Sequence, residues 1–115
     1  MLAKKHRLAA ERDFSRIFKR GRSMFVHGLG IRFVPNGLVQ SRIAFTISTK
    51  VSKDAVVRNT LRRRLRETMR KILPVLAPGY DIVFTAKPDA ARFLYGECEV
   101  RVIELLRRTR LITKI

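Results

Sequence analysis

Arginine side chains are concentrated in one segment, Lys53–Lys71, which holds six arginines and two lysines among nineteen residues. A guanidinium group presents a planar fork of donors that matches a phosphate, and it stays charged at physiological pH. Glu67 is the only acidic residue between Asp54 and Leu73, so intramolecular ion pairs cannot account for the cluster, and like charges on one helix repel. The chemistry offered is the binding of a polyanion, and we expect that polyanion to be RNA.

The arginines are set on a helical repeat, which fixes where they point. Apolar residues three or four positions apart fall on one side of a helix: Val57, Leu61, Leu65, Met69 and Ile72. The neighbouring arc carries the polar candidates: Arg58, Asn59, Arg62, Arg63, Arg66 and Arg70. We expect a helix that begins near Lys53 or Asp54 and ends near Leu73, before Pro74.

A second candidate surface involves aromatic residues. Phe14 and Phe18 lie four residues apart on a predicted amphipathic helix, flanked by Arg16, Lys19 and Arg20. Helical spacing alone favours a core position for both rings, whereas aromatic rings beside basic residues also suit stacking on unpaired bases. Both interpretations remain open for each ring.

The predicted strand Ser41–Lys50 supplies more candidates for this surface. Its alternation places Ile43, Phe45 and Ile47 on one face. The opposite face carries small, polar and basic residues that could form the floor of a groove: Arg42, Thr46, Ser48 and Lys50. The alternative for these four is an ordinary solvated face.

Residue types needed for nuclease chemistry are not grouped. His6 and His27 are isolated and the nine acids are scattered, whereas a two-metal site needs several convergent carboxylates. Cys98 falls on the apolar stripe of a predicted helix, which favours a buried thiol. We therefore expect no catalytic residue, no metal site and no cofactor bound by this chain.

Composition agrees with a polyanionic partner. Lys and Arg number 26 against nine Asp and Glu, giving a formal net charge of +17 and a pI near 11.6. This excess is more than solubility requires, and it predicts binding that weakens steeply with salt. The 46% hydrophobic content excludes a wholly disordered basic tail. We expect a single RNA-binding domain over residues 1–115, with a flexible basic N-terminus over residues 1–10.

Membrane and secreted locations are not favoured. No apolar run approaches the ~18 residues of a membrane span, and the N-terminal residues lack the apolar core of a secretion signal. The single cysteine permits no internal disulfide and fits a reducing compartment. These features predict a cytoplasmic protein without a membrane partner.

Periodicity and turn residues predict a small α+β domain. Helices are expected at Glu11–Arg20, at about Lys53–Leu73 and at Phe93–Arg110, and strands at Met24–Val34, Ser41–Lys50 and Tyr80–Ala86. Gly28 and Gly30 predict a split or bulge in the first strand. The order α-β-β-α-β-α implies helices packed on one central sheet.

Three segments together resemble a known family. RLAAERDFSRIFKRG is similar to the family's N-terminal signature at Arg7, Leu8, Asp13, Phe14, Phe18, Lys19 and Gly21. SRIAFTISTKV followed by AVVRNTLRRRLRE resembles its basic "RNR" segment at Lys50, Ala55, Val56, Arg58, Asn59, Arg62, Arg63, Arg66 and Glu67. YDIVFTAKP is like the strand and turn that follow that helix. The family is the protein subunit of bacterial ribonuclease P.

The resemblance implies a subunit of an endoribonuclease holoenzyme that removes the 5′ leader from precursor tRNA. A catalytic RNA subunit would hold the required magnesium ions, and this chain alone would not be catalytic. The protein would raise substrate affinity and lower the magnesium requirement. Its partners would be that RNA and precursor tRNA, with no obligate protein partner. The implied fold is a mostly antiparallel sheet with a left-handed β-α-β crossover, an exception to the usual hand.

Specific residues follow from the resemblance. The implied contacts with the RNA subunit are Arg58, Asn59, Arg62, Arg63, Arg66 and Arg70. The single-stranded leader would bind in a cleft beside the sheet, for which the candidates are Phe14, Phe18, Lys19, Arg42, Thr46, Ser48 and Lys50. Two positions depart from the family pattern: Thr60 stands where the family often has a basic residue, and Ser52-Lys53-Asp54 replaces a glycine-containing loop.

One alternative function has the same composition and fold class. A small structural RNA-binding protein of the ribosomal type would bind its RNA permanently and would not affect tRNA processing. The paired signatures at Asp13–Gly21 and Ala55–Glu67 favour the ribonuclease P subunit over it. A stand-alone nuclease is disfavoured by the scattered acids and histidines, and a DNA-binding domain by the scarcity of base-reading residues on the arginine helix.

Overall fold

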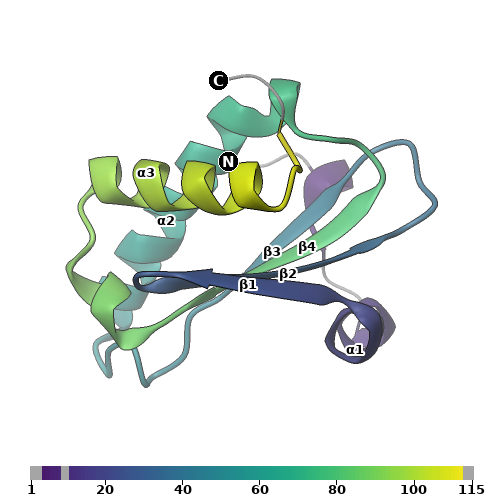
Figure 1. Cartoon of the computed structure of the whole chain (residues 1–115). Coiled ribbons are helices and arrows are strands. Elements are labelled where there is room, and N and C mark those ends of the chain that lie inside the picture. Colours follow the sequence, from purple (N-terminus) through teal and green to yellow (C-terminus); the bar gives the residue numbers. More distant parts are fainter. Residues whose placement is uncertain (1–3, 9–10, 113–115) are drawn as a thin grey trace.

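Four strands form one mixed sheet with helices on both faces (Figure 1). The computed structural model describes residues 4–8 and 11–112. The strands are β1 (Arg22–Val26), β2 (Leu29–Pro35), β3 (Arg42–Thr46) and β4 (Tyr80–Ala86), in the spatial order β1-β2-β4-β3. The helices are α1 (Glu11–Arg20), α2 (Ala55–Ile72) and α3 (Tyr95–Arg108). The predicted α+β class is confirmed, and the predicted ranges of α1 and β4 match their observed bounds.

The sheet is mostly antiparallel. β2 pairs antiparallel with β1 and with β4, whereas β3 pairs parallel with β4. A parallel pair needs a crossover connection, and α2 supplies it between β3 and β4. This is the β-α-β unit that the family resemblance implies.

The strands alternate between two hydrophobic clusters. Ile82 and Phe84 on β4 face the main core beneath α2 and α3, whereas Val83 between them faces a smaller cluster beneath α1. All three side chains are fully buried because helices cover both faces at the middle of β4. Cys98 on α3 belongs to the main core, and burial raises the pKa of its thiol to about 11.

The range predicted as one strand, Met24–Val34, is a hairpin. β1 and β2 are joined by His27 and Gly28, and Val26 pairs with Leu29. Gly28 adopts a φ of +76°, which favours glycine. A Cβ at Gly28 would also lie 2.4 Å from the Phe93 ring, so the turn packs directly on that side chain. The glycine-based split was predicted, but the full reversal of the chain was not.

The predicted strand Ser41–Lys50 is shorter in the structure, because β3 ends at Thr46. Ser48 and Lys50 lie in the turn that follows, where the Lys50 amide donates to the Ser48 Oγ at 3.2 Å. α2 begins after Asp54, whose Oδ1 accepts from the Val56 amide at 2.9 Å and caps the helix. The predicted helix start is therefore confirmed with its capping residue.

The described part of the N-terminal segment packs against the domain. Residues 4–6 form a short 3-10 helix, η1 (Lys4–His6), and Arg7 bridges to Ile43 of β3. The Leu8 amide donates to the Ile43 carbonyl at 2.9 Å, and the Leu8 side chain is buried. Residues 4–8 thus contact the sheet, and the flexibility expected of residues 1–10 stays a prediction; residues 1–3, 9 and 10 lie outside the described residues.

Candidate nucleic-acid interface

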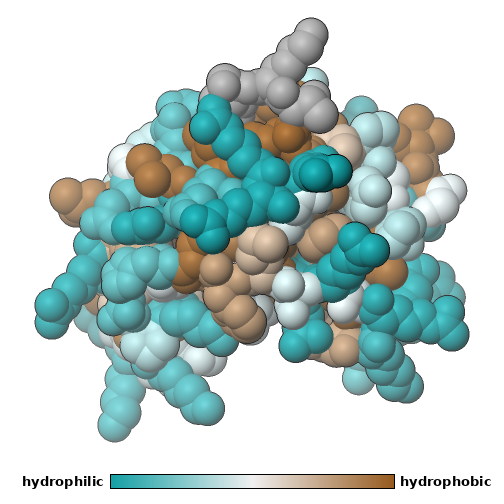
Figure 2. Space-filling view, viewed as in Figure 1, coloured by the Kyte–Doolittle hydropathy of each residue, from teal (hydrophilic) through white to brown (hydrophobic). Residues whose placement is uncertain are grey.

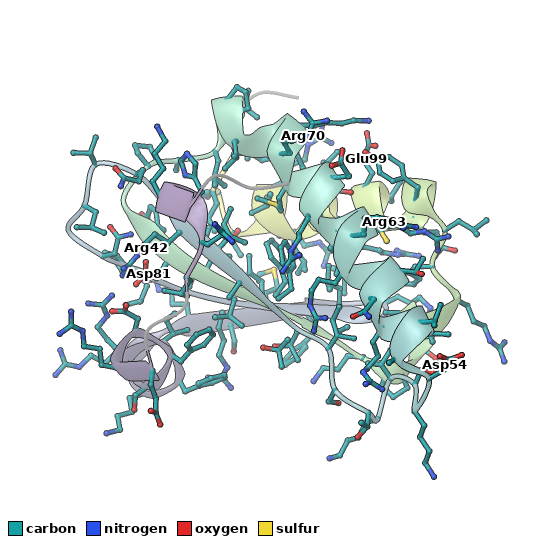
Figure 3. The ribbon with its side chains drawn as sticks, turned by 180° about the vertical axis from the view of Figure 1, so that it is seen from behind. Arg42, Asp54, Arg63, Arg70, Asp81 and Glu99 are labelled. Atoms are coloured by element: carbon teal, nitrogen blue, oxygen red, sulfur yellow. The ribbon has the colours of Figure 1, made fainter. Side chains whose placement is uncertain are left out.

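The first candidate surface is the outer side of α2. Its buried side carries Leu61, Leu65, Thr68, Met69 and Ile72. We call the opposite side the α2 arginine face and define it by the six predicted residues: Arg58, Asn59, Arg62, Arg63, Arg66 and Arg70. Figure 3 shows α2 crossing in front of the sheet, with Arg63 and Arg70 projecting from the helix. The structure thus brings the predicted set together on one helix, with four members exposed and Arg58 and Arg62 half-buried.

Internal contacts hold some of these side chains but leave others available. The Arg58 Nη1 donates to the Ser52 carbonyl at 2.9 Å, and the Arg62 Nη1 donates to the Asn59 Oδ1 at 3.3 Å. Arg70 pairs with Glu67 at 3.0 Å. Within the described residues, Arg63 and Arg66 have no hydrogen-bond or ion-pair partner.

Two basic residues of the same helix serve the fold instead. The Arg64 Nη1 donates to the Phe93 carbonyl at 2.6 Å and so ties α2 to the segment before α3. The Lys71 ammonium lies 4.8 Å from the centroid of the Tyr95 ring on α3. Neither belongs to the six predicted residues of the α2 arginine face, and their contacts give them a role in packing α2 against α3 and the segment before it.

The second candidate surface is a cleft on the other face of the sheet, beside α1. It has a volume of about 160 Å³. Its lining comes from α1, from the three strands β1, β2 and β4, and from the residue after β4: Phe18, Ser23, Phe25, Gly30, Ile31, Arg32, Thr85 and Lys87. We call this the α1 cleft.

The sheet register explains the floor of the α1 cleft. Phe25, Gly30, Thr85 and Thr46 are successive partners across β1, β2, β4 and β3. Gly30 leaves room for the neighbouring ring, since a Cβ there would lie 2.9 Å from Phe25 Cδ1. α1 covers the row that contains Val83 but leaves this row open.

Two aromatic rings in the cleft each face a cation. The Arg32 guanidinium lies 5.4 Å from the Phe18 centroid, and the Lys87 ammonium lies 5.0 Å from the Phe25 centroid. Both rings are more than half exposed, at 51% for Phe18 and 58% for Phe25. Exposed rings among positive charges can stack with unpaired bases while the charges hold the backbone.

The structure separates the two phenylalanines that the sequence left undecided. Phe14 is half-buried and packs against the small cluster of Leu8, Ile17 and Val83. Phe18 lines the α1 cleft. Around the helix Phe14 lies between Ile17 and Phe18 in angle, so exposure increases from the fully buried Ile17 through the half-buried Phe14 to the exposed Phe18.

The other predicted cleft residues are dispersed. Thr46 lies in the open row of the sheet, and Lys19 is exposed on α1 outside the cleft lining. Ser48 and Lys50 lie beyond the end of β3 and also do not line the cleft. Their expected place on a strand face is corrected by the shorter β3.

Arg42 does not belong to an open groove floor. Its Nε and Nη2 donate to the two oxygens of Asp81 at 2.8 and 2.7 Å, and its Nη2 lies 3.3 Å from Asp13 (Figure 3). The Arg16 Nη2 adds a contact of 2.6 Å to Asp81. Arg42 therefore links α1 to the sheet, a role that its place on the polar face of a strand did not reveal.

Asp81 is the centre of this network and its side chain is fully buried. Burial on its own would raise the pKa of Asp81. Hydrogen bonds from Arg42 and Asn36, with the charges of Arg42 and Arg16, outweigh burial and hold the pKa below its ordinary value. The carboxylate stays ionised and keeps α1 in the position that forms the wall of the cleft.

Several cleft residues were missed from sequence: Ser23, Phe25, Arg32, Thr85 and Lys87. For the three residues on β1 and β2 the reason is the hairpin. In one continuous strand, Phe25 and Arg32 would point to opposite faces, but the reversal at His27-Gly28 places both on the same face. A glycine after the first strand half was the available signal, since a two-residue hairpin loop commonly needs a positive φ.

The described part of the chain holds neither a metal-binding cluster nor a membrane-spanning helix. Over residues 4–8 and 11–112, no three His, Cys, Asp or Glu side chains lie close enough to share a metal ion. In the same ranges, no helix combines the length and the apolar character that a membrane crossing needs.

The fold and the two basic surfaces together define a small RNA-binding α+β domain. The Ribonuclease P family model matches residues 2–110. The "Ribonuclease P protein component" of Picosynechococcus sp. is 41% identical over 98 residues, covering 85% of this chain and 80% of that protein. That of Cyanothece sp. is 34% identical, covering 97% and 98%.

The similarity extends to solved structures of ribonuclease P proteins. The ribonuclease P protein from Thermotoga maritima, solved in complex with 1-(4-fluorophenyl)-2-thiourea, superposes with a TM-score of 0.82 at 32% identity, covering 89% of this chain and 98% of that chain. That from Staphylococcus aureus has a TM-score of 0.86 at 22% identity, covering 94% and 98%, and shows the shared fold. The chain belongs to the family of ribonuclease P protein components.

Proposed function

We propose that this chain assists a catalytic RNA in the endonucleolytic removal of the 5′ leader from precursor tRNA. It binds the RNA subunit through the α2 arginine face and the single-stranded leader in the α1 cleft. The observation that carries the proposal is the presence of two chemically different surfaces on opposite sides of one sheet, one rich in guanidinium groups and one combining aromatic rings with cations.

The two surfaces suit two kinds of RNA. Guanidinium groups on a rigid helix bind phosphates without reading sequence, which suits a folded RNA recognised by its backbone and shape. The rings of Phe18 and Phe25 offer stacking platforms, which suit the splayed bases of a single strand. When both RNAs are bound, the basic side chains offset the repulsion between them, so less magnesium is needed. The protein positions substrate, and the RNA subunit with its magnesium ions carries out the hydrolysis.

Reconstitution tests the function directly. The chain is mixed with a bacterial ribonuclease P RNA, and release of the 5′ leader from precursor tRNA is measured at low magnesium. We expect stimulation that requires both components. Failure to stimulate, combined with tight binding to ribosomal RNA, would instead support the structural RNA-binding protein.

Leader binding in the α1 cleft gives a further prediction. Phe18→Leu removes the stacking ring, and Phe18 is exposed enough that the core is not disturbed. Since stacking contributes roughly 1–3 kcal/mol per base, we expect about tenfold weaker binding of precursor tRNA by the holoenzyme. Binding of mature tRNA, which lacks the leader, should be unchanged.

The control is Val39→Ala, which alters another exposed apolar side chain, 87% accessible and outside the cleft. It should leave both affinities unchanged. Equal loss of precursor and mature tRNA binding by Phe18→Leu would argue against leader contact in the cleft.

A further inference from the structure

A second basic hollow lies between the C-terminal end of α3 and the start of β1; Figure 1 shows α3 lying over β1. It has a volume of about 270 Å³. Its lining combines three arginines, two hydroxyl residues and an apolar base: Arg22, Arg108, Arg110, Ser23, Thr109, Met24 and Phe33. Figure 2 shows this side of the molecule covered mostly by hydrophilic side chains, with smaller apolar areas between them. We call it the β1-edge hollow.

The charge in this hollow is unbalanced. Arg22 comes from β1, whereas Arg108 and Arg110 come from α3 and the turn after it. None of the lining residues is acidic. Arg108 contacts Glu104, which is not a lining residue, at 2.9 Å. Arg22 and Arg110 have no ion-pair partner within the part of the chain that the structure describes. The Thr109 hydroxyl donates to the Leu105 carbonyl at 2.8 Å, so the groups that suit a phosphate are the guanidinium groups and the Ser23 hydroxyl.

The backbone of Arg110 provides a second observation. Arg110 has a φ of 61°, the only positive value at a non-glycine residue in the described chain. Its amide donates to the Arg107 carbonyl at 3.0 Å, and the Leu111 amide donates to the Leu106 carbonyl at 2.9 Å. This pattern is a Schellman motif, and Arg110 occupies the position where glycine is favoured.

Stability does not explain an arginine at this position. A side chain in the left-handed region is unfavourable compared with glycine. The favourable interaction of cations with a helix C-terminus is already supplied by Arg107 and Arg108 in the last turn. A contact made by the Arg110 side chain with a partner accounts for an otherwise unfavourable choice.

The hollow and the α1 cleft lie on opposite faces of the sheet and meet at the edge strand β1. Met24 and Phe33 of the hollow face the main core, whereas Phe25 of the cleft faces the other way. Ser23 lines both, and among the described residues no strand pairs with the outer edge of β1. A strand of RNA lying over Phe25 can therefore continue past Ser23 and around this edge toward Arg22 and Arg110.

We propose that the β1-edge hollow binds backbone phosphates of a single-stranded RNA whose adjoining nucleotides occupy the α1 cleft. The inference rests on the proposed leader binding and extends it, because the protein would bind a longer stretch of leader than the α1 cleft alone accommodates. Recognition in the hollow is of phosphate, so it adds affinity for long leaders without adding a base preference.

The test compares two unstructured oligouridylates, of about 5 and about 12 nucleotides, within the site sizes known for single-strand binding surfaces. Binding to the full chain is measured by fluorescence anisotropy over a range of salt concentrations. The variant is Arg22→Gln combined with Arg110→Gly. Its control, Arg12→Gln combined with Arg92→Gln, removes the same charge from exposed positions outside the α1 cleft and the β1-edge hollow.

For the longer strand we expect the variant to bind about tenfold more weakly at about 0.15 M salt, with a salt slope shallower by roughly 1.4, since each phosphate contact on a single strand contributes about 0.7. For the shorter strand, variant and wild type should be equal. The melting temperature of the variant should not fall, because glycine suits the left-handed position. The control variant should affect both strands alike.

Equal affinities of variant and wild type for the longer strand would overturn the inference. The proposal that the leader binds in the α1 cleft would not be affected. An equal loss on both strands would also overturn it, because the arginines would then act only through net charge. Phe18→Leu separates the two proposals, since it should weaken both strands. If Phe18→Leu weakens the binding of neither strand, the proposal that the leader binds in the α1 cleft is wrong, whatever the result for the hollow.

Discussion

The double substitution Arg62→Ala and Arg66→Ala is expected to weaken binding to the ribonuclease P RNA by about 30-fold at about 0.15 M salt. Two phosphate contacts are lost, and each contributes about 0.9 to the slope of log affinity against log salt. The plot of log affinity against log salt should become shallower by roughly 1.8. Both side chains lie on the α2 arginine face. Arg66 has no internal partner within the described residues, and Arg62 makes only a 3.3 Å contact to Asn59.

Stability should change little, because Arg66 is exposed and the half-buried Arg62 bonds to Asn59 of its own helix. The measurement is a filter-binding titration at four or more salt concentrations, with circular dichroism melting as the check on folding. Arg64→Ala is a useful contrast, because its guanidinium donates to the Phe93 carbonyl at 2.6 Å and its loss should lower stability. An unchanged salt slope in the Arg62/Arg66 variant would show that these residues do not contact phosphate.

Replacing Asp81 with asparagine is expected to destabilise the domain by about 3 kcal/mol and to lower its melting temperature by roughly 10 °C. The shape of the side chain is preserved, but the charge that Arg16 and Arg42 contact at 2.6 and 2.7 Å is removed. Asp13, at 3.7 and 3.3 Å, remains as the only nearby carboxylate in the described structure. Two closely spaced guanidinium groups at the junction of α1 and the sheet would then be poorly compensated.

The effect should depend on pH in a defined direction. The folded-state pKa of Asp81 is lowered, so its contribution to stability is complete above the pKa of the unfolded chain, near 3.8. It is lost as pH falls through the still lower folded-state value. The difference between wild type and Asp81→Asn should therefore be largest near neutral pH and should shrink toward pH of about 2.

Urea unfolding at a series of pH values measures this difference. Glu11→Gln is the matched control, since it removes one exposed carboxylate from α1 and should cost little at any pH. A stability gap of the same size at neutral and acid pH would mean that the ionised form of Asp81 does not stabilise the fold.

These two substitutions act on different parts of the proposed function. Loss of the α2 arginines would reduce assembly with the RNA subunit, whereas loss of the Asp81 charge would release α1 and so disturb the wall of the α1 cleft that carries Phe18. A holoenzyme with Asp81→Asn is therefore expected to lose discrimination for precursor tRNA near its melting temperature, before it loses the RNA subunit.

The sequence by itself determined the features that depend on local periodicity. The bounds of α1 and β4, the Asp54 cap of α2 and the buried stripe of α3 follow from residue spacing and capping chemistry within single elements. The α2 arginine face follows in the same way, because a helix fixes the angle between successive side chains without help from other elements.

Only the tertiary structure decided which residues from different elements meet. The hairpin at Gly28 brought Phe25 and Arg32 to one face, the placement of α1 left Phe18 exposed and Phe14 packed, and the partners of Asp81 turned Arg42 into an anchor. The β1-edge hollow joins residues more than 80 positions apart, Arg22 and Arg110. Such juxtapositions depend on strand register and on long-range packing, which residue spacing within a single element does not encode.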